Sequence, residues 1–163
     1  MALQIFTFFF ATLLAAAAFG YPNVGNKVQW TGEVTHPDGT SVEVKIVKEV
    51  IAQDRKTKKW TVKFVATMGS ETTTQIIEVD SLYSPERYKE IMANCILQGG
   101  KIEKITTPAG MYDTCKMTMV TADGSTVEKW WGDIPFGVVS KNTRDASTGE
   151  VKKPDLNSVV AGL

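Results

Sequence analysis

Hydrophobic and polar residues alternate along most of the chain, as they do in half-buried β-strands. Val28, Trp30 and Val34, for example, share one face of the first such stretch. The alternating stretches are residues 28–34, 42–46, 60–67, 72–79, 101–106, 112–121, 127–131 and 136–140, with 156–160 as a further candidate near the end. Asp38-Gly39 and Asp123-Gly124 supply turn residues typical of hairpins. The pattern therefore predicts about eight mainly antiparallel strands, with one buried and one wet face.

Residues 84–98 depart from this alternation and predict the single helix. Ser84 suits the N-cap, Pro85 suits the first helical position, and two glycines end the segment. The apolar residues recur at helical spacing on one stripe, which comprises Tyr88, Ile91, Met92, Cys95 and Ile96. A helix against one face of an antiparallel sheet is an α+β architecture. We expect the sheet to be curved, half-barrel-like and packed on this helix.

The N-terminus predicts export. Residues 5–19 are almost purely apolar, and this stretch is shorter than the ~20 residues of a membrane span. Small residues near Gly20 suit cleavage, although no Lys or Arg precedes Lys27. We therefore expect a signal peptide over residues 1–20, a single domain over 21–163, no stable membrane span after cleavage, and a periplasmic or secreted location. An uncleaved N-terminal anchor is the alternative.

The chain has two cysteines, Cys95 and Cys115. In an exported protein an isolated pair predicts a disulfide, with two buried free thiols as the alternative. On the chain-entropy model such a link stabilises the fold by roughly 3 kcal/mol. The bond would join the helix end to the buried face of the sheet.

The remaining chemistry is sparse. The 18 basic and 18 acidic residues cancel, so the sequence lacks the basic excess expected of a nucleic-acid-binding protein. His36 is the only histidine and lies in a predicted turn, where we expect it to be solvated. Glu103, Glu128 and Asp133 could form paired carboxylates only if the fold brought them together. No catalytic residue, metal site or cofactor is predicted.

Adjacent Trp130 and Trp131 must face opposite sides of a strand. The glycine-rich segment after them favours either an ordinary core corner or an apolar cavity. In the second interpretation the candidate lining residues come from the strands and the helix: Trp131, Phe136, Met117, Met119, Ile91, Met92 and Tyr88. Methionine adapts to apolar ligands of varied shape, but is also common in cores.

The second half of the chain has a recognisable layout. An Ala-Gly-aromatic turn in residues 107–112 leads into a strand that contains Cys115, and a strand ending in Trp is followed by a Pro-Phe-Gly-Val segment in residues 131–139. This layout resembles uncharacterised Gram-negative exported proteins similar to the periplasmic lipoprotein carriers. The resemblance covers roughly residues 101–140 and implies a curved, incomplete barrel over an apolar cavity. The chain differs from that group in having one helix rather than several, and no obvious basic residue for the cavity.

Three functions follow as expectations. The first is a non-catalytic periplasmic protein that binds or carries a lipid, lipoprotein acyl chain or other apolar ligand. The second is a structural or interaction protein of the cell envelope with a filled core, and the third is a hydrolase of unidentified type. A cavity of several hundred Å³ would favour the first. The sequence carries no signal for an oligomeric state.

Overall fold

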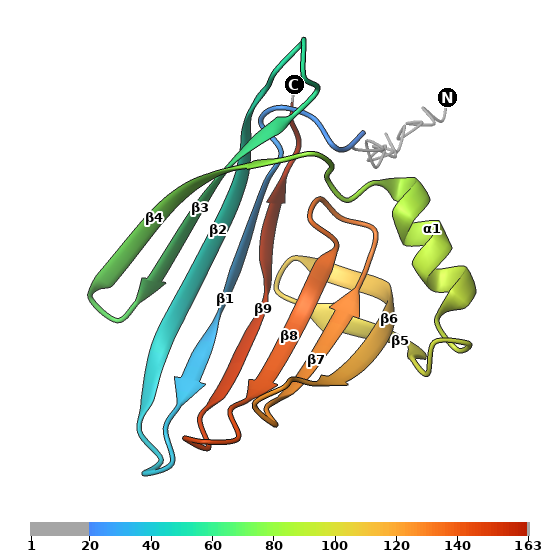
Figure 1. The fold of residues 1–163 in the computed structure, drawn as a ribbon. Helices are drawn as coiled ribbons and strands as arrows, with labels where there is room; N and C mark the ends of the chain where they lie inside the picture. Colours follow the sequence, from blue (N-terminus) through green and yellow to red (C-terminus); the bar gives the residue numbers. More distant parts are fainter. Residues whose placement is uncertain (1–19, 163) are drawn as a thin grey trace, which may run out of the picture.

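The computed structural model describes residues 20–162, so the predicted signal peptide lies outside the described residues except for its last position. The described chain forms one nine-stranded antiparallel sheet, strongly curved and open, with a single α-helix at one side (Figure 1). The predicted α+β, half-barrel-like class is confirmed. Within residues 20–162 no helix is long and apolar enough to cross a membrane.

The sheet consists of two meanders. In chain order the elements are β1 Lys27–Thr35, β2 Ser41–Gln53, β3 Trp60–Met68, β4 Glu71–Val79, α1 Pro85–Asn94, β5 Lys101–Thr107, β6 Gly110–Val120, β7 Thr126–Trp131, β8 Val138–Arg144 and β9 Val151–Val160. Their order across the sheet is β4-β3-β2-β1-β9-β8-β7-β6-β5. Pairing of β1 with β9 therefore joins the meanders, and α1 lies in the connection between the two edge strands.

The ninth strand arises from the polar C-terminal segment. A turn over residues 145–150, closed by the Asp145 amide donating to the Glu150 carbonyl at 2.9 Å, separates β8 from β9. Pro154 and Leu156 lie opposite Gly32 and Trp30 of β1, on the inner face. Leu156 is fully buried. Many residues of this segment are polar because one face of the strand is exposed to solvent. The strand paired with β1 therefore begins at Val151, earlier than the stretch 156–160 that the sequence pattern indicated.

The core lies where the two meanders meet. Val28 and Trp30 of β1 pack with Ile134, Val139 and Leu156 from the second meander. Register shifts interrupt three of the strand pairs, at positions 29/30, 50/52 and 130/131. Such bulges increase the local twist and bend of a strand, which favours the curvature of this sheet.

Helix α1 is shorter than predicted and ends at Asn94. The Ser84 side chain caps it by accepting from the Arg87 amide at 3.3 Å. Beyond Cys95 the backbone turns back, because the Gly100 amide donates to the Cys95 carbonyl at 2.8 Å. Ile96 is therefore 64% exposed, and its predicted place on the buried stripe is wrong.

The predicted disulfide is present between Cys95 and Cys115. Both residues are fully buried, and their Cα atoms lie 5.8 Å apart. The Tyr88 hydroxyl adds a second link to β6, donating to the Asp113 carbonyl at 3.2 Å. The helix thus lies beside β6 rather than over the centre of the sheet, and the concave face stays open (Figure 1).

Candidate functional site

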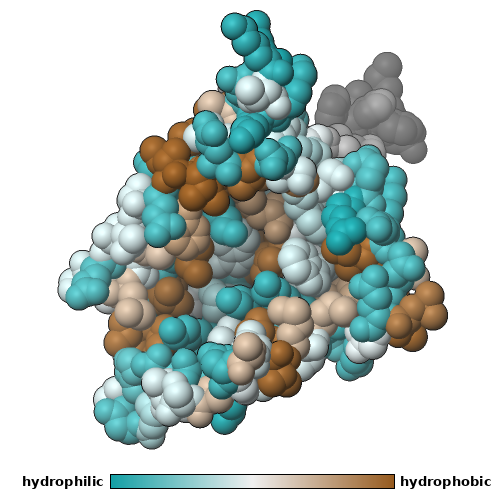
Figure 2. Space-filling model, in the orientation of Figure 1, coloured by the Kyte–Doolittle hydropathy of each residue, from teal (hydrophilic) through white to brown (hydrophobic). Residues whose placement is uncertain are grey.

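The concave side of the sheet holds an open cavity of about 450 Å³. This volume is within the ~300–1,000 Å³ of small-ligand sites. The space-filling view shows this side hollowed between the strands of the first meander and the helix (Figure 2). Both meanders and the β4–α1 connection contribute its lining, which comprises Lys48, Val62, Phe64, Ile77, Val79, Ser81, Leu82, Tyr83, Arg87, Trp131 and Phe136.

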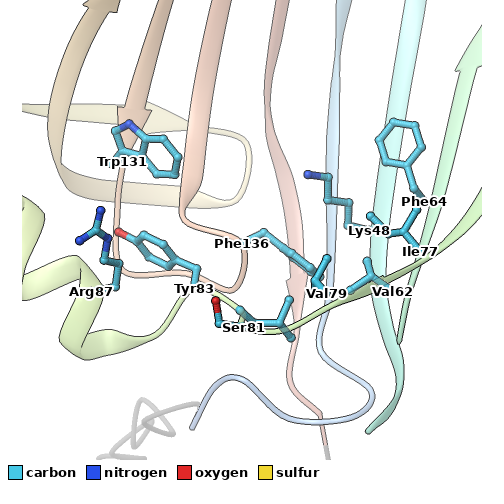
Figure 3. Close-up of a pocket in the computed structure, with 11 residues that line it drawn as sticks. Lys48, Val62, Phe64, Ile77, Val79, Ser81, Tyr83, Arg87, Trp131 and Phe136 are labelled. Atoms are coloured by element: carbon cyan, nitrogen blue, oxygen red, sulfur yellow. The ribbon is translucent and has the colours of Figure 1, made fainter. Parts of the chain in front are cut away.

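One wall follows directly from strand alternation. Val62 and Phe64 occupy alternate positions of β3, so they share its inner face. Ile77 lies opposite Val62 in the register of β3 with β4, and Val79 continues the same face of β4. These side chains give the cavity an aliphatic and aromatic wall (Figure 3).

The opposite wall is a stack of aromatic rings. Tyr83, in the β4–α1 connection, stacks on Trp131 of β7 with ring centroids 5.8 Å apart. Tyr21 stacks on Tyr83 at 6.4 Å. Gly137 allows this approach, because a Cβ there would lie 2.6 Å from the Tyr83 ring. Burial raises the pKa of the Tyr83 phenol, which keeps the hydroxyl neutral well above physiological pH.

Phe136 adds a ring held in an uncommon backbone conformation. Its φ is +65°, in the left-handed region that a bulky side chain rarely adopts. The surrounding loop holds it there, since the Gly132 amide donates to the Gly137 carbonyl at 2.8 Å. The ring of Phe136 lines the cavity next to Lys48 (Figure 3).

Lys48 places a positive charge at this aromatic surface. Its Nζ lies 5.8 Å from the Phe136 ring centroid and 5.9 Å from those of Trp30 and Phe64. Burial lowers the pKa of Lys48, and the charges of Lys129 and Lys141 lower it further. The expectation that no basic residue lies at the cavity is therefore wrong.

A smaller cavity of about 250 Å³ adjoins the first and shares Lys48 and Phe64 with it. Lys129 of β7 and Lys141 of β8 also line it and lie directly opposite each other in the strand register. Burial, followed by the charge of Lys129, lowers the pKa of Lys141. Three lysines thus converge beside the larger, apolar cavity.

The predicted pocket residues divide into two groups. Trp131 and Phe136 line the 450 Å³ cavity. The other five lie at the helix or on β6, outside the lining of this cavity: Tyr88, Ile91, Met92, Met117 and Met119. Met117 approaches Gly100 near the disulfide, and Met119 is 47% exposed.

The candidate carboxylates do not form a catalytic pair. Glu103 accepts from the Trp130 indole at 2.5 Å and pairs with Lys101, whereas Glu128 pairs with Lys116 at 2.6 Å. These ion pairs hold the pKa values of both glutamates below their ordinary range. Such groups remain ionised and paired, which favours a structural role.

Asp133 has a different partner, the Tyr21 hydroxyl, which donates to it at 2.5 Å. This bond ties the residues before β1 to the loop after β7.

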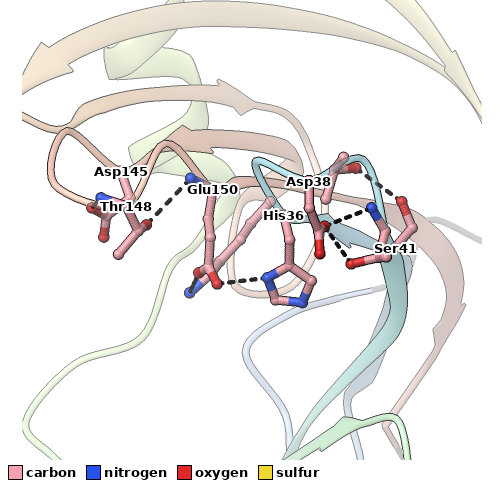
Figure 4. Close-up of polar contacts among 9 residues, drawn as sticks. His36, Asp38, Ser41, Asp145, Thr148 and Glu150 are labelled. Atoms are coloured by element: carbon pink, nitrogen blue, oxygen red, sulfur yellow. Dashed lines mark hydrogen bonds and ion pairs between the residues drawn. The ribbon is translucent and has the colours of Figure 1, made fainter.

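His36 belongs to a polar cluster at the β1–β2 and β8–β9 turns (Figure 4). Its Nδ1 lies 2.8 Å from Glu150 Oε1, and its side chain is 34% exposed, so it is only partly solvated. Glu150 also pairs with Lys152 at 3.7 Å. Across residues 20–162 no group of three or more His, Cys, Asp or Glu side chains could hold a metal ion.

No protein-family model matches the sequence, and no curated protein was found to be similar to it. Among solved structures the chain is similar to a candidate exported protein with a YMCC-like fold from Bacteroides fragilis, at 11% identity and a TM-score of 0.49, covering 87% of this chain and 99% of that one. A candidate lipoprotein from Parabacteroides distasonis matches at 12% identity and a TM-score of 0.45, covering 87% and 98%. A LolA superfamily protein from Nitrosomonas europaea matches at 10% identity and a TM-score of 0.32, covering 88% of each chain.

Proposed function

We propose that this protein is a non-catalytic periplasmic binding protein that holds a lipid, acyl chain or other apolar ligand on the concave face of its sheet. The observation that carries the proposal is the 450 Å³ cavity walled by apolar side chains from both meanders. An apolar pocket with a few convergent polar groups is the general form of a small-ligand site.

The alternatives receive less support. A structural protein with a filled core would pack the space between β3, β4 and β7, which is the space that the cavity occupies. A hydrolase would need a carboxylate or nucleophile with a perturbed pKa facing the cavity. Glu103 and Glu128 instead belong to ion pairs, and neither lines the cavity.

A periplasmic location agrees with the apolar leader and with the disulfide. A stretch of 15 residues near the N-terminus, apolar except for Thr7 and Thr12, is typical of the core of a signal peptide. The Cys95–Cys115 bond needs an oxidising compartment to form and persist. The mature protein would then reach its ligand outside the cytoplasm.

A matched pair of variants on β4 tests the site. Ile77 lines the cavity, whereas its neighbour Ile76 points to the other face of the sheet. Both residues are substantially exposed, at 46% and 63%, so each tolerates a polar replacement. Ile77→Asp should lower the affinity for a fluorescent fatty acid about tenfold, because it places a carboxylate against the bound chain. Ile76→Asp should bind as the wild type does.

The measurement is a fluorescence titration of the purified mature protein, with native mass spectrometry to detect co-purified lipid. Failure of the wild type to bind the probe, together with a clean apo mass, would refute the proposal. Equal binding by both variants would place the ligand elsewhere on the molecule.

A further inference from the structure

Three lysines occupy positions at which their strands otherwise present apolar side chains inward. Lys48 lies between Ile46 and Val50 on the inner face of β2. Lys129 alternates with Val127 and Trp131 on β7; Val127 is buried, and Trp131 lines the 450 Å³ cavity. Lys141 follows Val139, a core residue, on the same face of β8. Alternation alone would place apolar residues at all three positions.

These lysines have no counter-charge within the described chain. No Asp or Glu in residues 20–162 forms an ion pair with Lys48, Lys129 or Lys141, and no hydrogen bond to their ammonium groups is present there. Other cations near the site do have partners. Arg87 pairs with Glu90 at 2.6 Å, and Lys152 pairs with Glu150.

Convergence of like charges on an apolar surface is unfavourable unless something compensates it. The lysines repel one another, and the aromatic rings around Lys48 offset only part of the cost of removing its ammonium from water. The overall charge of the chain is zero, so this cluster is not a by-product of a basic protein. An arrangement that is costly in the empty protein fits a binding partner of opposite charge.

We propose that the ligand is a single-chain amphiphile with an anionic head, a carboxylate or a phosphate. The head lies in the 250 Å³ cavity among Lys48, Lys129 and Lys141, and the alkyl chain extends into the 450 Å³ cavity beneath Tyr83. Lys48 and Phe64 line both cavities, so head and chain meet at that boundary. This inference rests on the proposed function and specifies its ligand.

The geometry also favours one chain over two. The apolar cavity is in the lower half of the ~300–1,000 Å³ range of small-ligand sites. The stacked rings of Tyr83 and Trp131 limit its width on one side, and the strand wall that includes Val62 limits it on the other (Figure 3).

The test compares three ligands with the same alkyl chain: dodecanoate, dodecyl phosphate and dodecanol. Each ligand is titrated into a complex of the mature protein with the uncharged dye N-phenylnaphthylamine, at neutral pH and low salt, and displacement of the dye is measured. We expect both anions to bind about tenfold more tightly than the alcohol. Lys48→Met and Lys141→Met should each remove most of this preference, measured within each variant as the ratio of the anion affinities to the dodecanol affinity. Lys45→Met, on the outer face of the same strand as Lys48, is the matched control and should keep the preference.

Each other outcome has a distinct meaning. If none of the three ligands displaces the dye and the dye itself does not bind, the proposed function fails. If all three bind equally, or if the lysine variants keep the preference for anions, the apolar site stands and the inference about its head group is overturned. Inorganic phosphate that competes as strongly as dodecyl phosphate would overturn the amphiphile in favour of a free anion. Circular dichroism of each variant confirms that it is folded.

Discussion

Replacing Lys48 by methionine should stabilise the ligand-free protein. Lys48 carries its charge into a partly buried, aromatic environment that contains no carboxylate partner among residues 20–162. Methionine keeps an unbranched side chain of similar reach and has no charge to desolvate. If the lysine is retained for binding rather than for folding, its removal should increase the free energy of unfolding.

The magnitude follows from three opposing contributions. Loss of the cation–π contacts with Trp30, Phe64 and Phe136 costs about 0.5–1 kcal/mol. Sulfur–aromatic contacts of the new methionine return about 0.3–1.5 kcal/mol. These two contributions are of similar size, so relief of the desolvated charge and of repulsion from Lys129 and Lys141 sets the sign. We expect a net gain of about 1 kcal/mol at neutral pH, an ordinary size for a single substitution. For a domain of this size that gain raises Tm by roughly 3 °C.

The gain should depend on pH in a defined direction. Burial, then repulsion from Lys129 and Lys141, lowers the pKa of Lys48 in the folded protein below its ordinary value. Between the lowered pKa and about 10.4 the unfolded chain binds more protons at this site, so the wild type gains stability as pH rises. The advantage of Lys48→Met should be largest below the folded-state pKa and should shrink as pH rises towards 10.

Urea unfolding followed by circular dichroism at pH 7 and at pH 10 measures both effects. Lys45→Met, on the exposed face of β2, controls for a lysine-to-methionine change and should alter the free energy of unfolding by less than about 0.5 kcal/mol. A loss of 1 kcal/mol or more in Lys48→Met at pH 7 would refute the reasoning. It would show that the aromatic rings stabilise the ammonium more than burial destabilises it.

Two further predictions concern the scaffold around the cavity. Reduction and alkylation of the Cys95–Cys115 bond should lower the free energy of unfolding by roughly 3 kcal/mol, measured by thermal and urea denaturation, and an unchanged Tm would reject a stabilising role for this bond. Gly137→Ala should destabilise the fold by at least about 1 kcal/mol more than Gly39→Ala and should weaken dye binding, because its Cβ would lie 2.6 Å from the Tyr83 ring whereas Gly39 has open space around it. Both glycines have positive φ, so equal losses of stability in the two variants would mean that the backbone conformation, and not the ring, sets the cost.

Local patterns predicted the elements that depend on local physics. The alternation of Val28, Trp30 and Val34 indicated an inner face, and all three are buried in the structure. Ser84 and Pro85 indicated the start of the helix, which begins where expected. The predicted end of the helix was wrong, because the backbone reverses direction after Cys95 and helical spacing alone does not show that reversal.

The site depends on long-range pairing, which explains why only part of it could be predicted. Trp131 and Phe136 were identified because bulky rings beside glycines mark a strand break. Tyr83 could not be identified, because its connection reaches the cavity only by passing from one edge of the sheet to the other. The sequence of such a connection lacks the periodicity of a strand or helix, so it does not indicate which way a side chain faces.

The lysines show that strand alternation can also indicate a binding group. The informative feature is a charged residue at a strand position where alternation predicts an inward-facing apolar side chain. Lys48 and Lys129 each interrupt an inward apolar series, and a lysine at such a position is rarely buried without a partner. Register assigns both to the inner face, and pairing is absent among residues 20–162. Lys48 belongs to the first meander and Lys129 to the second, so the two converge only because β1 pairs with β9. The same pairing that closes the core therefore assembles the basic end of the cavity, and a head group bound there would contact both halves of the sheet at once.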